Sequence, residues 1–351
     1  MSSRRDRRAA RRRNPRAYAF VALVLVCAIA GGVYFLVADP ASSGRGIAHV
    51  TIAPPRDLAP TAAAPHVLIV NQSTKGYGHL AVAPLDDPNG PRAVTSLRCV
   101  RAAYAHGGGL CLFDQNGIVN TVGLDVFDAR FRVRHHIDLP GIPSRTRVAP
   151  NGKVGATTVF VTGDNYASAT FSTRTNFVDL VHGRIVGDLE KFRVTHDGVV
   201  VDSTDRNYWG VTFAADSNTF YATLGTGGHT YLIRGDLRRE TARVIHDDVE
   251  CPSLSPDGRR IAYKRRRAGD ALGSASWRLH VLDLRTGKDV ALAERRSVDD
   301  QVIWVDDETI GYSIPHPEVS VDADDVLTVP ADGSGHPTPW VRGAASPAVV
   351  R

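Results

Sequence analysis

The sequence lacks the short motifs that identify several common classes of enzyme. It contains no Gly-x-Ser-x-Gly nucleophile turn, no His-Glu-x-x-His zinc motif and no phosphate-binding glycine loop. Each of these motifs places a nucleophile, a metal or a phosphate in a fixed geometry, so the absence argues against the corresponding hydrolases, metallopeptidases and nucleotide-binding enzymes. We therefore predict that the protein is not an enzyme and needs no cofactor.

Charge is absent from a long stretch near the N-terminus. Residues 17–38 contain no Asp, Glu, Lys or Arg, whereas residues 1–16 contain eight arginines and one acid, Asp6. A helix of this length spans about 33 Å, enough to cross a hydrocarbon core of about 30 Å. Arginine-rich flanks stay in the cytoplasm. The sequence thus predicts a cytoplasmic tail (1–16), a transmembrane signal-anchor helix (17–38) and an extracytoplasmic remainder in the cell membrane.

Two other roles of the apolar stretch are open. The small residues 28–30 before Gly31 resemble a signal-peptide cleavage site, but the apolar sequence continues to residue 38, which a cleaved peptide does not need. Cys27 is a poor candidate for a lipid anchor because Val26, which is not a small residue, precedes it. We favour a retained, single-pass anchor.

The basic isoelectric point comes from the N-terminal tail. The whole chain has a formal charge of +5, and eight arginines against one aspartate give residues 1–16 a charge of +7. The other residues therefore carry a net charge of −2. Because no basic excess is left outside the tail, we predict no nucleic-acid partner.

The remainder divides into a linker and one large domain. Residues 39–64 are rich in Pro, Ala, Gly and Ser and show no hydrophobic period, which predicts an extended, partly disordered linker. Residues 65–351 are too many for one ordinary hydrophobic core, so internal repeats are expected.

One repeated unit is a β-hairpin with a tight turn. In residues 252–264 a short strand leads into Pro-Asp-Gly (256–258) and then into a strand that alternates at period two. Proline fixes φ in the turn, aspartate can bond its own backbone, and glycine accepts a positive φ. Related units occupy residues 148–161, 211–222 and 302–312 and, in a looser form, 99–113.

A second repeated hairpin alternates with the first. Its clearest copy is residues 280–292, where a strand, an Arg-Thr-Gly turn and a second strand follow each other. Similar segments occupy residues 80–87, 123–128, 177–184, 231–236 and 327–335. Two hairpins make a four-stranded antiparallel sheet, which is one blade of a β-propeller.

The spacing of the repeats predicts six blades. First strands begin near residues 99, 146, 210, 251, 301 and 346. The interval from 146 to 210 is the longest and leaves room for an excursion near 163–175 or 197–208. The last unit, 346–350, lacks its second strand, and the first strand of the domain, 66–70, lacks its partner. We predict that these two strands pair and close the ring.

The repeat resembles a known family. The run Ser-Pro-Asp-Gly-Arg-Arg-Ile-Ala-Tyr (255–263) resembles the PD40 repeat of TolB-type propellers, and residues 207–214 and 250–255 resemble actinobacterial membrane proteins described as TolB-like. The resemblance implies an all-β, six-bladed propeller. It covers the propeller only, because TolB-type proteins carry an α/β domain where this chain has an anchor and a linker. The repeat also occurs in propellers attached to serine peptidases, so it indicates the fold better than the function.

Histidines and clustered acids suggest an alternative function. Some six-bladed propellers perform chemistry with a metal in the channel, and the candidate ligands here are His106, His135, His136, His196, His229, His246, Asp247-Asp248 and the acids from Asp322 to Asp325. None has a diagnostic spacing, and turns or solvated loops are commoner places for these residues. We therefore predict no metal site. The four tryptophans are interpreted as blade packing: Trp209, Trp277, Trp304 and Trp340.

Two cysteines lie in one predicted hairpin. Cys99 and Cys111 are about equally far from its turn, and facing residues of antiparallel strands have Cα atoms about 4.5–5.5 Å apart, within reach of a disulfide. Outside the membrane such a bond persists. We predict a Cys99–Cys111 disulfide, with two buried thiols as the alternative. Cys251 is then free and buried.

These features predict a scaffold rather than a catalyst. We expect a TolB-like propeller, anchored to the membrane by one N-terminal helix, that uses its loops and one channel mouth to bind a protein or ligand of the cell envelope. The alternative is a metal-dependent envelope hydrolase or lyase acting at the propeller channel.

The predicted topology is testable with reporters fused to the C-terminus. A reporter active only outside the membrane should be active, and a reporter active only in the cytoplasm should be silent, because the arginine cluster keeps the N-terminus inside. The reverse pattern would contradict the topology. A mature N-terminus at Gly31 would instead show that the helix is cleaved.

Overall fold

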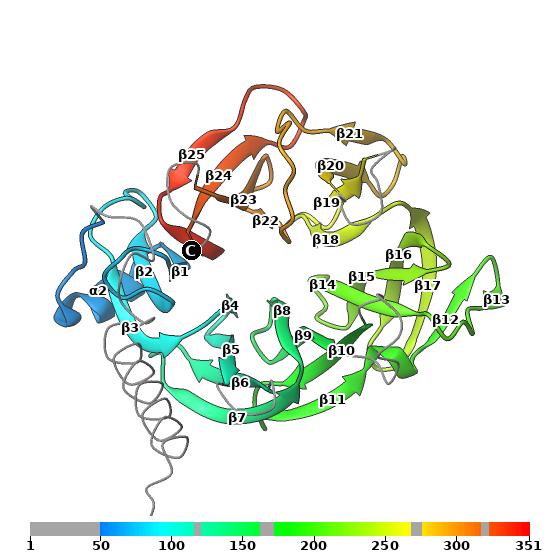
Figure 1. Cartoon of the computed structure of the whole chain (residues 1–351), viewed down its shortest axis with the longest axis horizontal. Helices are drawn as coiled ribbons and strands as arrows, with labels where there is room; N and C mark the ends of the chain where they lie inside the picture. Colours follow the sequence, from blue (N-terminus) through cyan, green and yellow to red (C-terminus); the bar gives the residue numbers. More distant parts are fainter. Residues whose placement is uncertain (1–49, 116–120, 162–171, 268–275, 317–322) are drawn as a thin grey trace, which may run out of the picture. The chain divides into compact units, whose positions relative to one another are not determined.

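The computed structural model describes residues 50–115, 121–161, 172–267, 276–316 and 323–351 (Figure 1). The predicted tail, the predicted anchor helix and residues 39–49 lie outside these ranges. Within the described ranges, no helix is long and apolar enough to cross a membrane.

In the described residues, six sheets follow one another around a ring, and all their strand pairs are antiparallel except one in blade four (Figure 1). The first three blades, each given from its inner to its outer strand, are built from the following strands. Blade one contains β26 (Ala344–Val350), β1 (His66–Asn71), β2 (His79–Pro84) and β3 (Ala93–Arg98). Blade two contains β4 (Arg101–Ala105), β5 (Gly108–Gln115), β6 (Thr121–Asp128) and β7 (Val133–Pro140). Blade three contains β8 (Ile142–Val148), β9 (Val154–Val161), β10 (Ser172–Asp179) and β11 (Arg184–Asp188).

The last three blades complete the ring. Blade four contains β14 (Asn207–Phe213), β15 (Thr219–Thr226), β16 (His229–Asp236) and β17 (Thr241–Asp247). Blade five contains β18 (Glu250–Leu254), β19 (Arg260–Arg266), β20 (Trp277–Asp283) and β21 (Asp289–Ala291). Blade six contains β22 (Ile303–Trp304), β23 (Thr309–Pro315), β24 (Asp324–Pro330) and β25 (Thr338–Val341). The predicted all-β, six-bladed propeller is confirmed.

The turns between the first and second strands of blades three to six share one local feature. An Asn or Asp side chain accepts a hydrogen bond from the backbone N–H two residues later, and so fixes the reversal of the chain. The acceptors and donors are Asn151 and Lys153 (2.9 Å), Asp216 and Asn218 (3.0 Å), Asp257 and Arg259 (3.0 Å), and Asp306 and Glu308 (2.9 Å). In the Pro-Asp-Gly copy, Gly258 has a φ of 71°, as the sequence predicts.

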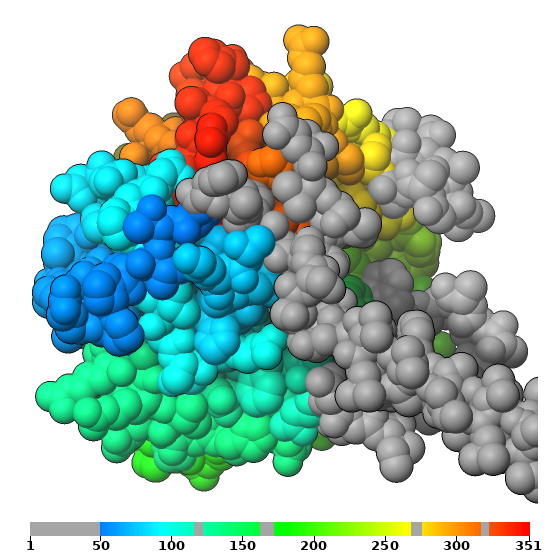
Figure 2. All heavy atoms as spheres, turned by 60° about the vertical axis from the view of Figure 1, so that its left-hand side comes forward, coloured from blue at the N-terminus to red at the C-terminus, as the bar shows by residue number. Residues whose placement is uncertain are grey.

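The ring closes between the two ends of the domain. β26 pairs antiparallel with β1, and Val67 faces Val349 across the pair. Both strands therefore belong to blade one, although almost the whole domain separates them in sequence. Figure 2 shows the N-terminal (blue) and C-terminal (red) segments together on one side of the molecule. The predicted strand closure is confirmed.

A buried arginine holds this closure in place. Arg92 directly precedes β3, and its side chain is 1% exposed. Its guanidinium donates hydrogen bonds to the carbonyl of Gly343 (2.8 Å), the carbonyl of Arg342 and the side chain of Asn71 (3.1 Å). These acceptors lie at the start of β26 and the end of β1. Burial, opposed by the charge of Asp325, lowers the pKa of Arg92 to about 10, so it stays protonated at neutral pH.

The hydrophobic core lies between the blades. In the described part of the chain, buried side chains form six clusters, and each cluster joins one pair of neighbouring blades. In the cluster between blades three and four, the rings of Phe177 and Phe220 have centroids 4.9 Å apart. The side chains of β1 alternate between the cluster on one face of its sheet and the cluster on the other, so this strand is buried on both faces. Closing the ring therefore creates the cluster between blades one and six.

The end of the predicted linker is ordered, which corrects the expectation that it is extended. Residues 50–64 contain the 3₁₀ turn η1 (Pro55–Asp57) and the short helix α2 (Leu58–Ala63). Leu58 and Ala62 pack on the cluster between blades one and two, and the N–H of Ala53 bonds the carbonyl of Arg92 (2.7 Å). These tertiary contacts, which composition does not encode, favour helix over extended chain.

The long repeat interval contains an insertion. After η2 (Leu189–Lys191), the hairpin of β12 (Arg193–His196) and β13 (Val199–Val200) joins the outer edge of blade four. β12 pairs parallel with β17, with Arg193 opposite Thr241. Blade four is thus a six-stranded sheet. The repeat spacing indicated room for extra residues in this interval, but it did not predict that they form two further strands.

Deletion of residues 346–351 tests the closure. It removes most of β26, so β1 loses its partner and two sheet edges are exposed. The side chains of Val349 and Val350 are only half-buried, so most of the loss comes from backbone hydrogen bonds, each worth about 0.5–1.5 kcal/mol. We expect the melting temperature to fall by roughly 5–10 °C, with aggregation. A matched deletion of residues 41–46 should change neither, and an unaltered melting temperature in the first variant would contradict the closure.

Candidate functional site

The histidines and acids considered as metal ligands are spread over the ring. His136 contacts Asp125 (2.7 Å) and Asp138 (3.1 Å), and the hydrogen bond with Asp125 raises the pKa of His136. Asp248 pairs with Arg265 (2.9 Å). The others lie as follows: His106 in the β4–β5 turn, His135 on β7, His196 on β12, His229 on β16, His246 and Asp247 on β17, Asp324 and Asp325 on β24. Asp322 lies outside the described residues. No three potential metal ligands gather anywhere in the described ranges.

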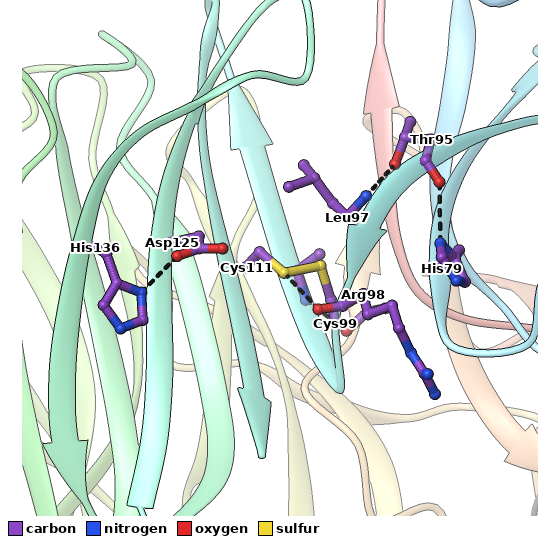
Figure 3. Close-up of a disulfide and its surroundings, with 10 residues drawn as sticks. His79, Thr95, Leu97, Arg98, Cys99, Cys111, Asp125 and His136 are labelled. Atoms are coloured by element: carbon purple, nitrogen blue, oxygen red, sulfur yellow. Dashed lines mark hydrogen bonds and ion pairs between the residues drawn. A yellow bond between two sulfur atoms is a disulfide. The ribbon is translucent and has the colours of Figure 1, made fainter. Parts of the chain in front are cut away.

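The structure joins Cys99 and Cys111 by a disulfide, with Cα atoms 5.3 Å apart (Figure 3). The two residues do not face each other in the hairpin, however, because the partner of Cys111 across β4 and β5 is Ala102. Cys99 lies before β4, in the passage from blade one, and Cys111 Sγ is 3.1 Å from the carbonyl of Arg98. The bond thus fastens the chain between two blades rather than the two arms of one hairpin. Cys251 is free and buried.

A cavity of about 590 Å³ opens at one mouth of the channel. Blades two to five contribute residues to its lining, and Asp299, which precedes blade six, completes it. Many of these residues lie at the start of an inner strand or at the end of β19. Its lining is Arg101, Pro143, Ser144, Arg145, Phe160, Trp209, Glu250, Cys251, Lys264, Arg266, Trp277 and Asp299. Because strand pairing fixes these positions, the cavity exists before any ligand binds. We call it the cationic mouth, for its four basic and two acidic side chains.

Two arginines lie side by side in this mouth. Arg101 Nε donates to the carbonyl of Ser144 (3.1 Å), and Arg145 donates to the same carbonyl (2.9 Å) and to Asp299 (3.2 Å). Burial and then the neighbouring charge of Arg145 lower the pKa of Arg101, although acids nearby, including Asp300, oppose this. Burial acts to lower the pKa of Arg145, but neighbouring groups that include Asp300 and Asp299 outweigh it and raise the pKa. Two guanidinium groups side by side can bind an anion.

A buried lysine shares Asp299 with Arg145. Lys264 is 4% exposed and forms an ion pair with Asp299 and a longer one with Glu250 (3.9 Å). Burial acts to raise the pKa of Asp299, but the pairing with Lys264 outweighs it and the pKa is lowered. Glu250 also pairs with Arg266 (3.5 Å). Both carboxylates of the mouth are therefore committed to cations, and the basic side chains are in excess.

Aromatic rings complete the lining of the mouth. Two of the four tryptophans lie there, whereas the sequence predicted that all four pack within the blades. Trp209 and Trp277 line the cavity, and Lys264 Nζ lies 4.2 Å from the centre of the Trp277 ring. Phe160 is 37% exposed at the same place. Trp304, in contrast, is buried and donates to the carbonyl of Ser253 (2.9 Å), and Trp340 packs between blades one and six.

The opposite mouth has a different character. A cavity of about 450 Å³ is lined by the ends of the inner strands, with many apolar side chains such as Tyr104, Trp304 and Val349. Arg147 reaches this cavity and donates to the carbonyl of Val302 (3.1 Å). Burial lowers the pKa of Arg147 to about 10, so it too is charged at neutral pH. Of the basic side chains that line the two cavities, four lie at the cationic mouth and one, Arg147, lies here.

Sequence reasoning missed the cationic mouth, although a signal for it exists. Its residues come from several separate strands of blades two to five and from Asp299, so no short motif forms. Aligning the six repeat starts would have revealed it, because the following residues lie within two positions of a start: Arg101, Arg145, Trp209, Glu250 and Asp299. A position that carries charge or an aromatic ring in several successive blades points to the channel.

Comparisons with known proteins agree with the fold. No family model and no curated protein matches the chain. Among solved structures it is similar to TolB from Acinetobacter baumannii, with a TM-score of 0.54 and 14% identity over 81% of this chain and 66% of that chain. It is also similar to the tricorn protease (TM-score 0.48, 9% identity, 78% of this chain and 29% of that one) and to a chain of a nidogen–laminin complex (0.48, 10%, 82% and 98%). At these identities the similarity shows the propeller fold alone.

Thiol labelling tests the disulfide. Protein prepared without reductant and unfolded in denaturant should label only at Cys27 and Cys251, and reduction should expose Cys99 and Cys111. A loop this short stabilises the fold by at most about 3 kcal/mol, so the reduced protein should still fold but melt earlier. Labelling of all four cysteines before reduction would refute the bond.

Proposed function

We propose that the protein is a non-catalytic binding module of the cell envelope that holds a ligand or partner protein at the cationic mouth. The observation that carries this proposal is the excess of basic side chains in a preformed cavity to which several blades contribute. In this proposal the predicted N-terminal helix keeps the propeller at the outer face of the membrane.

The arrangement favours binding over chemistry. Its lysine and both carboxylates are already engaged with one another, at 3.9 Å or less. A proton-transfer catalyst needs a titratable group free to exchange protons with a substrate. A rigid cavity that offers guanidinium groups beside flat aromatic faces instead suits recognition of a negatively charged group. The fold itself is shared with TolB as well as with proteases, so it does not decide the matter.

Site-specific photo-crosslinking in intact cells tests the proposal. A photoreactive amino acid replaces Phe160 at the rim of the mouth or, as a control position, Val199 on the outer hairpin, which is 71% exposed. We expect adducts from position 160 and few from position 199. The double substitution Arg101→Gln/Arg145→Gln should remove the adducts, because it removes two of the four cations that line the mouth.

A matched variant controls for a general loss of charge. Arg193→Gln/Arg234→Gln removes two arginines from a surface groove of blade four and should leave the adducts unchanged. Equal adducts from both positions, or adducts that survive Arg101→Gln/Arg145→Gln, would contradict binding at the mouth. A stoichiometric divalent ion in the purified protein would favour the metal-dependent hydrolase or lyase instead.

A further inference from the structure

A second basic cavity adjoins the cationic mouth on blade five. It has a volume of about 460 Å³, and its lining contains five arginines and one histidine but no acid: Arg265, Arg266, Arg267, Arg278, His280 and Arg295. We call it the arginine cleft. Arg266, at the end of β19, lines both this cleft and the mouth, so the two cavities meet at this residue.

Part of the charge in the cleft is balanced by neighbouring acids. Arg265 pairs with Asp248 (2.9 Å) and Asp289 (3.2 Å), and His280 shares Asp289 (3.1 Å). These pairs leave little free charge at the wall formed by Arg265 and His280.

The other side of the cleft is not balanced. Arg267 donates to the backbone carbonyl of Arg295, and Arg278 donates to that of Leu292 (3.2 Å). Among the described residues, no carboxylate lies within ion-pair distance of Arg267, Arg278 or Arg295. Backbone bonds thus orient two of these guanidinium groups while their charges stay unmatched, which is the arrangement of a receptor for carboxylate or phosphate.

We propose that one linear acidic glycan binds across the mouth and the arginine cleft, with its first acidic group at Arg101 and Arg145 and later ones along Arg266 and Arg267. The inference rests on the proposed function of the mouth. A small anion would fill one cavity only, whereas a chain with repeated negative charges can occupy two basic cavities that share Arg266.

The aromatic rings of the mouth favour a glycan over an acidic peptide. Trp209 and Phe160 lie beside the cations, and a flat apolar ring packs against the C–H face of a sugar while the acid group of that sugar pairs with an arginine. The acid can be a carboxylate or a phosphate, since guanidinium groups bind both in the same bidentate way.

Binding measured against chain length tests the inference. The full-length protein, purified in detergent, is titrated by calorimetry with digalacturonate, decagalacturonate, polyphosphate of ten units, poly-glutamate of ten residues and neutral dextran. The decamer should bind at least about tenfold more tightly than the dimer, because its later acids reach the cleft. Dextran should not bind, and the preferred polyanion identifies carboxylate or phosphate as the natural acid group.

Two exposed arginines of the cleft provide the decisive variant. Arg267→Gln/Arg295→Gln should abolish the length advantage and reduce the salt dependence, yet leave dimer affinity within about twofold. Arg101→Gln/Arg145→Gln should weaken both lengths, and Arg193→Gln/Arg234→Gln should weaken neither. Melting curves confirm that each variant is folded.

The contrary outcomes are distinct. Equal affinity for both lengths, or an unaffected length advantage in the cleft variant, overturns the extended site while binding at the mouth still stands. Poly-glutamate that binds as tightly as the glycan overturns the glycan class. No binding of any polyanion overturns the inference, and the crosslinking at position 160 then decides separately whether the mouth binds a different partner.

Discussion

The pairing of β26 with β1 is the constraint on which the rest of the structure depends. Every other pair of blades is joined by consecutive chain, but blades six and one meet only because the C-terminal strand completes the first sheet. This pairing adds the sixth interblade cluster, where Val67 and Ile69 meet Val326. Without it, a chain of blades would have two open edges and no defined channel.

Arg92 shows how much the closure needs to be fixed. A fully buried guanidinium is costly, and here it is bonded to carbonyls that immediately precede β26, with no carboxylate at ion-pair distance among the described residues. Bonds from a charged donor are each worth about 1.5–3 kcal/mol, and removing the donor would remove them from the closure. The arginine therefore sets the register at which the last strand enters the ring.

The closed ring also explains why charges accumulate at the mouth. Inner strands from successive blades converge there, so single residues far apart in sequence, such as Arg101, Glu250 and Asp299, line one cavity. The burial of Arg101 and of Lys264 opposes folding, and the apolar clusters between blades must offset that cost. Such a cost is typical of a site built for binding rather than for stability.

The sequence predicted what local chemistry determines and missed what long-range contacts determine. The Pro-Asp-Gly turn at 256–258 and the period-two strands depend on neighbouring residues, and the unpaired strands at the two ends implied closure. The parallel pairing of β12 with β17 and the packing of α2 depend on residues far apart in the chain, which have no pattern of their own. The register error at Cys99 is local, because the turn between Ala105 and Gly108 lies later than the midpoint between the two cysteines. The cationic mouth was missed because it exists only after the ring brings blades two to five and Asp299 together.

Engineered crosslinking of the facing pair His66 and Val350 tests the ring closure most directly. Facing residues of an antiparallel pair are within reach of a disulfide. In His66→Cys/Val350→Cys, the account predicts a crosslink within one chain that forms on mild oxidation, shifts the mobility of the denatured protein, is reversed by reductant and raises the melting temperature. A protein that forms no such crosslink, or forms it only between two chains, would contradict the closed six-bladed ring.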